Sequence, residues 1–175
     1  MGLASGPVAE LVAGDAFCGF LVGIAAENLL GFTTQNARRN ELATNAASLP
    51  RKLVGQDTVI HTRRPEAWLS LSETDAALLD FLRHGGRVSE LKPKDTIRRT
   101  LELLSSAGRY ERLAKAADTE PLRVPAMLGA LGERLGKRPR ALNRLRASLN
   151  PLSRFDFGSL AGLPNARSWQ AKERR

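Results

Sequence analysis

The order of apolar and polar positions divides the chain into short apolar segments at the beginning and regular helical stripes further on. The run at residues 16–22 is almost wholly apolar, a pattern that fits either a buried strand or the front of a longer helix. In the next segment Ala25, Leu29 and Phe32 share one helical stripe, and Gly31 stands where a helix end favours a left-handed residue. The pattern predicts a short buried helix that ends sharply and has Leu29 in the core.

Two β-prone runs follow at residues 51–54 and 58–64, joined by a short connection that contains Gly55. The alternation within the second run and the length of the connection predict a β-hairpin. His61 is then expected to be an exposed strand residue. Together with the polar segments around them, these runs predict a small β-meander between about residues 38 and 71.

Regular apolar stripes predict helices throughout the second half of the chain. They are expected at residues 72–84, at 93–106, at 109–117, from after Pro125 to 135, and at 139–149. Ser72 and Asp75 have the spacing of a capping box at the start of the first of these helices. Gly129 and Gly132 lie inside the fourth, at a cost of roughly 1 kcal/mol each, which indicates close approach of another backbone.

These patterns predict an α+β fold in which a small β-meander or hairpin region precedes a helical C-terminal half. The expected parts are an α/β subdomain at residues 1–71, a helical subdomain at 72–150 and a tail at 151–175. A further short helix is predicted at residues 8–13. The tail is expected to pack on the body up to about Trp169, because a disordered tail has little reason to carry so many aromatic and leucine side chains.

Positive charge is concentrated towards the end of the chain. The net charge is +9, and residues 121–175 hold twelve Lys or Arg against three Asp or Glu. This asymmetry favours an acidic protein partner or nucleic acid, while a basic face that only aids solubility is the alternative. The expected basic surface spans one helix end and the next helix, and consists of Arg134, Lys137, Arg138, Arg140, Arg144 and Arg146.

The residue types argue against catalysis and against a bound metal or cofactor. One cysteine and two histidines are too few for a disulfide framework or a common zinc pattern, and Cys18 is expected to be a small buried side chain. The sequence contains no phosphate-cradling glycine loop and no nucleophile elbow, although an enzyme that uses isolated carboxylates has no such signature. No apolar run reaches the ~18 residues of a membrane span. We therefore predict a soluble, cytoplasmic binding protein that is not an enzyme.

The letters AAENLLGFTTQ resemble the motif AAN-x-LGL-[ST]TQ in the middle domain of AbiEi-like antitoxins. The residues that carry this resemblance are Ala25, Ala26, Asn28, Leu29, Gly31, Thr34 and Gln35. Further agreement with the family is found at Gly55, Ile60, Arg63 and Arg64, and the similar region extends from about residue 8 to residue 135.

The resemblance implies an antitoxin and transcriptional regulator of a type IV, or abortive-infection, toxin–antitoxin pair, whose partner is a nucleotidyltransferase toxin. Full-length members of the family begin with a winged helix-turn-helix that binds the promoter, and this chain begins after the place where that domain would end. The resemblance therefore implies the toxin-antagonising part of such a protein and puts promoter binding in doubt.

Residues 74–112 support an alternative interpretation. A helix, a Gly-Gly turn, a connector and a second helix with exposed Arg98 and Arg99 resemble a helix-turn-helix in outline. The connector is longer than the usual turn, and the second helix lacks Asn, Gln or Ser at the start of its outer face. The alternative function is a DNA-binding transcriptional regulator that uses this segment or the basic C-terminal third.

Overall fold

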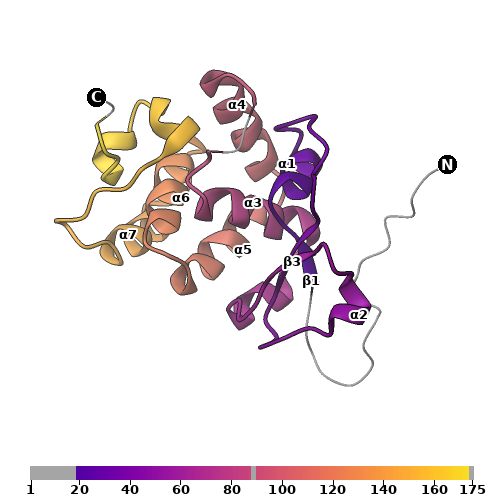
Figure 1. Ribbon diagram of the computed structural model, residues 1–175. Helices are drawn as coiled ribbons and strands as arrows, with labels where there is room; N and C mark the ends of the chain where they lie inside the picture. Colours follow the sequence, from indigo (N-terminus) through magenta and orange to yellow (C-terminus); the bar gives the residue numbers. More distant parts are fainter. Residues whose placement is uncertain (1–18, 88–89, 174–175) are drawn as a thin grey trace.

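The computed structural model describes residues 19–87 and 90–173 and shows an α+β fold (Figure 1). A small sheet and two short helices form one side of the molecule, and longer helices with the final segment form the rest. The predicted fold class, with its helical C-terminal half, is confirmed. The helix predicted at residues 8–13 and the expected burial of Cys18 lie outside the described residues.

The sheet is small and mixed. Its strands are β1 (Gly19–Leu21), β2 (Glu41–Thr44) and β3 (Val59–His61), in that order across the sheet. β1 runs antiparallel to β2, with Phe20 opposite Ala43. β2 and β3 are parallel, with Leu42 opposite Ile60. Of the two alternatives for residues 16–22, the part that the structure describes shows the strand, at Gly19–Leu21.

The predicted hairpin between residues 51–54 and 58–64 is wrong. The first run forms the one-turn helix α2 (Arg51–Val54), and β3 pairs with β2 instead. Pro50 enters this turn with φ −60°, and Thr58 closes it because its Oγ1 donates to the carbonyl oxygen of Val54 at 2.5 Å. Parallel strands need a crossover connection rather than a tight turn, and α2 forms part of that connection.

Helix α1 (Ile24–Leu30) is short and ends at the predicted glycine, but it does not have the predicted orientation. It ends at Gly31, whose φ of 75° and ψ of 25° are the left-handed conformation expected at a helix end. Ala26 and Leu30 face the core, whereas Leu29 is 49% exposed. The prediction that Leu29 is a core residue is therefore wrong.

The start of α1 is anchored by a contact from far along the chain. The backbone N–H of Gly23, just before α1, donates to Asp80 Oδ2 at 3.1 Å, and Asp80 belongs to helix α3 (Glu73–Arg83). This bond ties the start of α1 to α3, and α1 buries the face that packs on α3. Two turns of helix carry too few apolar positions to specify that face by periodicity alone.

We expect Leu30→Ala to lower the free energy of unfolding by about 2–5 kcal/mol, because it leaves a cavity in the core. Leu29→Ala is the matched control, with the same chemical change on an exposed side chain, and should cost less than about 1 kcal/mol. Urea unfolding of both variants measures the difference. A larger loss for Leu29→Ala than for Leu30→Ala would contradict the described orientation of α1.

The helices after α3 follow the predicted spans to within a few residues. They are α4 (Pro93–Leu104), α5 (Arg109–Ala116), α6 (Arg123–Arg134) and α7 (Pro139–Ala147). Ser72 caps α3 as predicted, because its Oγ accepts from the backbone N–H of Asp75 at 3.1 Å. α6 begins before Pro125 rather than after it, since the first turn of a helix accepts a residue that has no N–H.

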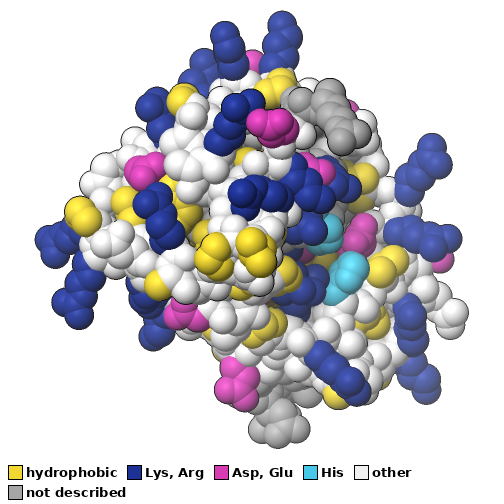
Figure 2. Space-filling model, turned by 90° about the vertical axis from the view of Figure 1, so that its left-hand side faces the viewer, with side chains coloured by type: hydrophobic (Ala, Val, Ile, Leu, Met, Phe, Trp, Pro, Cys, Tyr) yellow, Lys and Arg dark blue, Asp and Glu magenta, His cyan; other side chains and the backbone are white. Residues whose placement is uncertain are grey.

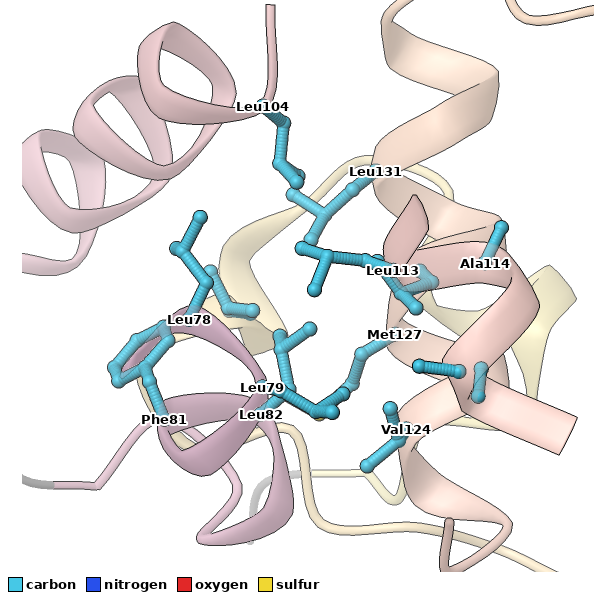
Figure 3. Close-up of a cluster of buried hydrophobic side chains, with 14 of the residues drawn as sticks. Leu78, Leu79, Phe81, Leu82, Leu104, Leu113, Ala114, Val124, Met127 and Leu131 are labelled. Carbon is cyan, nitrogen blue, oxygen red and sulfur yellow. The ribbon is translucent and has the colours of Figure 1, made fainter. Parts of the chain in front are cut away.

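Helix α3 is the centre of the hydrophobic core. Every residue from 75 to 82 is buried. In Figure 3, Leu79 of α3 points towards Leu113 of α5 and Met127 of α6. The same cluster of buried side chains continues to Phe20 in β1, so the sheet and the later helices pack on one shared helix.

Two aromatic side chains explain the glycines inside α6. A Cβ atom added at Gly129 would lie 2.0 Å from the ring of Trp169, and one added at Gly132 would lie 2.0 Å from Tyr110 Oη. The predicted close approach is present, but it is made by side chains and not by another backbone.

The final segment packs on the body, as predicted. It contains the 3-10 helices η4 (Gly158–Gly162) and η5 (Ala166–Trp169), and Trp169 is 0% exposed. Phe155 and Ala171 form a parallel β-bridge that closes the segment on itself.

The other tryptophan, Trp68, lies at the sheet side of the core in the 3-10 helix η2 (Glu66–Ser70). It is 1% exposed, and its Nε1 donates to Glu120 Oε1 at 2.7 Å. The guanidinium of Arg64 lies 5.3 Å from the centre of its ring, and Arg83 Nη1 is 2.5 Å from the other oxygen of Glu120. The buried carboxylate therefore has a partner at each oxygen.

Candidate functional site: a basic groove between α5 and α7

A groove of about 730 Å³ lies between α5, the turn after α6, and α7. We call it the basic groove. It is lined by Tyr110, Glu111, Ala114, Lys115, Leu135, Gly136, Lys137, Arg138, Ala141 and Arg144.

The floor of the basic groove is apolar and fixed. Tyr110 is 1% exposed and its hydroxyl donates to the carbonyl oxygen of Leu128 at 2.9 Å, while burial raises the pKa of Tyr110 and keeps that proton in place. Ala114 on α5 and Ala141 on α7 line the groove with side chains that end at Cβ. Gly136 has φ +68° and no atom within 4 Å of where its Cβ would lie, so the turn leaves the mouth open.

The rim of the basic groove carries an excess of positive charge. Its charged lining residues are the cations Lys115, Lys137, Arg138 and Arg144 and the single carboxylate Glu111. Lys137 Nζ lies 2.8 Å from Glu111 Oε1 and 5.0 Å from the centre of the Tyr110 ring. The hydrogen bond from Lys137 holds the pKa of Glu111 below its usual value. The charges of Lys137 and Glu111 thus offset each other, and Lys115, Arg138 and Arg144 account for the excess positive charge of the rim.

The remaining cations differ in how far they are engaged. Arg144 Nη2 donates to the carbonyl oxygen of Ala114 at 2.8 Å, and Arg144 Nη1 lies 3.5 Å from Asp118 Oδ2. Lys115 and Arg138 are exposed, and no carboxylate in the described part of the chain lies within salt-bridge distance of either. These two side chains can therefore meet an incoming anion without breaking an existing pair.

The structure brings part of the predicted basic surface together. The members that line the basic groove are Lys137, Arg138 and Arg144. Arg134 and Arg140 are exposed at the end of α6 and the start of α7, outside the lining. Figure 2 shows the side of the molecule on which α7 lies in Figure 1, and Lys and Arg side chains outnumber Asp and Glu there.

Arg146, a member of the predicted basic surface, lies outside the lining of the basic groove and contacts the final segment. Its guanidinium lies 4.4 Å from the centre of the Trp169 ring, and its Nη2 lies 3.4 Å from Glu133 Oε1. The indole Nε1 of Trp169 donates to Glu133 Oε2 at 3.1 Å. Arg146 therefore helps to hold the final segment and does not line the groove.

Lys115 and the groove floor were not singled out from the sequence. Tyr110 and Ala114 lie four residues apart on α5, which places them on one helix face. That spacing is a readable signal, but it does not tell which other helix faces them. Leu135 and Ala141 complete the floor from another part of the chain.

The residues of the family motif close the end of α1 and lie away from the basic groove. Thr33 Oγ1 and the backbone N–H of Thr34 donate to Glu90 Oε2 at 2.6 and 3.2 Å. Gln35 Nε2 donates to the other oxygen of Glu90, and Asn28 Nδ2 donates to the carbonyl oxygen of Gln35 at 2.7 Å. The bond from Thr33 lowers the pKa of Glu90. The motif thus clamps the loop after α1 to the segment before α4.

A cluster of ionisable groups, with Glu27 and Asp80 buried and His84 exposed at its edge, lies between α1 and α3. Glu27 is 3% exposed and its Oε2 has no hydrogen-bond partner; burial, and then the charge of Asp80, raises the pKa of Glu27 to about 8. His84 Nδ1 donates to the carbonyl oxygen of Asp80 at 2.9 Å, and hydrogen bonding to Asp80 raises the pKa of His84. Arg64 Nη2 lies 3.8 Å from Asp80 Oδ1. The sequence pattern missed this cluster because Glu27 stands in an otherwise apolar stretch.

His61 is half-buried rather than exposed, because its Nε2 lies 2.9 Å from Glu41 Oε2 on the neighbouring strand. Its pairing across the sheet is the reason for the difference from the prediction. Within the described residues, no three His, Cys, Asp or Glu side chains are placed to hold a metal ion.

The second helix of the segment that resembles a helix-turn-helix is α4, and it packs on the final segment. Ile97 of α4 packs on η4, where its Cδ1 lies 3.4 Å from a Cβ added at Gly162. Arg98 Nη2 pairs with Asp95 at 2.9 Å, and Arg99 Nε donates to a carbonyl oxygen at the end of α1. Both arginines of α4 thus have partners within the chain, while the side chain of Arg98 remains 71% exposed.

Comparison of the chain with protein-family models, with curated proteins and with solved structures found no significant match. The family resemblance therefore rests on the quoted residues. Among the helices of the described residues, none is long and apolar enough to cross a membrane.

Proposed function

We propose that the protein is antitoxin-like and that it binds and neutralises a cognate nucleotidyltransferase toxin through the basic groove and the arginines beside it. The observation that carries this proposal is the basic groove itself, a fixed apolar floor within a rim of excess positive charge. The resemblance at residues 25–35 supplies the class of partner.

The charge distribution supports an acidic protein partner. Residues 121–175 hold twelve basic and three acidic residues, among them the exposed Arg138 and Arg140, and Lys115 adds an exposed cation on α5. A nucleotidyltransferase has a carboxylate-lined active-site face, which is complementary in sign. Such complementarity mainly raises the association rate and fixes the orientation of the partners.

The double variant Arg138→Glu/Arg140→Glu tests the proposal, because both side chains are exposed and neither has an acidic partner among the described residues. We expect association with the toxin to slow by about tenfold or more and rescue of growth in co-expression to weaken, with the fold retained. The measurements are growth with the product of the neighbouring gene and binding kinetics with that purified product.

Arg38→Glu/Arg39→Glu is the matched control, since it makes the same charge change at exposed positions near α1. It should leave rescue close to that of the wild type. Equal loss in both double variants would contradict a local contact at the groove. Failure of the wild-type chain to relieve a toxic neighbour would remove support for the antitoxin function.

Binding to duplex DNA is the other outcome that the experiment can reveal. In that case each lost phosphate contact should reduce the slope of log affinity against log salt by about 0.9. A steep slope that flattens in Arg138→Glu/Arg140→Glu would assign the basic surface to nucleic acid instead.

A further inference from the structure

We infer that the basic groove receives a short acidic segment of the partner that carries at least one large apolar side chain. This inference rests on the proposed function for the identity of the partner, and it adds how the partner is recognised. The apolar side chain lies on the floor, and the flanking carboxylates meet the rim.

The shape of the groove supports an inserted side chain over a flat charged contact. Its volume of about 730 Å³ falls within the range of roughly 300–1,000 Å³ that is typical of ligand sites. Ala114, Ala141 and Gly136 have small side chains or none and leave room between α5 and α7, where Leu135 and Ala141 are only half-buried. An apolar group that enters this space loses contact with water, which a bare charge–charge contact would not achieve.

The charges of the groove support carboxylates beside that apolar group. Lys115 and Arg138 lie on opposite walls, on α5 and at the start of α7, and neither is paired with a carboxylate of the described residues. Arg138 occupies the N-cap position of α7 without a side-chain hydrogen bond, so the positive end of the helix dipole adds to the same potential. An acidic segment can thus be held at two points around its apolar residue.

The same features argue against a nucleic-acid strand in the groove. Single strands are held by bases that stack on exposed aromatic faces. Tyr110 is the aromatic residue of the lining, and it is 1% exposed with Lys137 above its ring. A phosphate backbone also gains nothing from the apolar floor.

Ala141→Trp tests the inference, because it fills the groove without changing any charge. We expect the dissociation constant for the purified toxin to rise by about tenfold or more, while the helix is retained. Ala147→Trp is the matched control, because Ala147 is exposed on the same helix and outside the lining. Lys115→Glu, an exposed substitution that leaves the packing untouched, is a second variant and should weaken binding in the same direction.

The outcomes separate this inference from the proposed function. Wild-type affinity in Ala141→Trp, combined with weakened binding in Arg138→Glu/Arg140→Glu, would overturn the groove insertion and leave the antitoxin function standing. No binding by the wild-type chain would remove the antitoxin function itself.

A titration without the toxin tests the groove alone. Two synthetic acidic peptides are added in turn to the full chain, and amide chemical shifts are followed. Both contain Asp and Glu; the apolar acidic peptide also contains Leu and Phe, and the serine peptide has Ser in place of that Leu and Phe. We expect shifts at Ala114, Lys115 and Ala141 with the apolar acidic peptide. Equal shifts with the serine peptide, or larger shifts with a single-stranded oligonucleotide, would overturn the inference.

Discussion

Raising the pH from about 5 to about 9 is expected to lower the free energy of unfolding by on the order of 3–4 kcal/mol, because Glu27 must then ionise in its buried position. The pKa of Glu27 is raised from 4.5 to about 8 in the folded protein. The folded state therefore holds a proton that the unfolded state releases. Its stabilising contribution is fully present below about 4.5 and is lost as the pH rises through about 8.

His84 acts in the same direction over this range. Its pKa is raised above the ordinary 6.5 by hydrogen bonding to Asp80, so its contribution is present below that value and is lost as the pH rises through the folded value. Asp75 acts in the opposite sense. Burial pushes its pKa upwards, but the guanidinium groups of Arg112 and Arg109 outweigh burial and hold the pKa below 3.8. Its contribution is lost only in acid, below the range of the experiment.

Guanidinium unfolding at a series of pH values, on the wild type and on Glu27→Gln, measures the effect. The amide cannot ionise, so the variant should lose most of the slope and keep the smaller part that comes from His84. Glu66→Gln, at an exposed glutamate, is the control and should keep the full slope. A Glu27→Gln protein that still loses stability as steeply as the wild type would show that Glu27 is not the titrating group.

Trp169→Ala is expected to lower the free energy of unfolding by about 3–5 kcal/mol, because it empties a fully buried site. The ring of Trp169 fills the space left by the missing side chain of Gly129 in α6, because a Cβ atom added there would lie 2.0 Å from the ring. The substitution also removes the donor to Glu133 and the ring surface beneath Arg146. The final segment would then lose the side chain with which η5 packs on α6.

Leu152→Ala is the control for this effect, since Leu152 lies in the same final segment but is 90% exposed. It should change the free energy of unfolding by no more than about 0.5 kcal/mol. Thermal and denaturant unfolding of both variants give the comparison. A loss of about 1 kcal/mol or less in Trp169→Ala would mean that the final segment contributes little to the fold.

The helices from α3 onwards were predictable because each carries both an apolar stripe and a recognisable boundary. Ser72 caps α3 through its hydroxyl, and Pro93 and Pro139 stand in the first turns of α4 and α7. These signals are local, so the sequence is sufficient to reveal them. The orientation of α1 depends instead on its packing against α3, which is far away in the sequence.

The sheet was harder to predict for the same reason. β3 is only three residues long and pairs in parallel with β2, a partner that no local turn identifies. The basic side chains of the candidate site could be found by counting charges, since they lie close together in the sequence. The floor could not, because Tyr110 and Ala141 line one groove only when α5 and α7 both pack on α6. Burial of Glu27 is likewise a property of the tertiary structure.

The two buried tryptophans provide an intrinsic fluorescence probe on each side of the core. Trp68 lies on the sheet side and Trp169 lies under the final segment, and each indole is buried against a glutamate. Each of the variants Trp68→Phe and Trp169→Phe retains one tryptophan. The wavelength of its emission maximum therefore reports unfolding on one side of the core only. Coincident melting of the two signals would mean that the shared helix α3 makes sheet and helices a single cooperative unit.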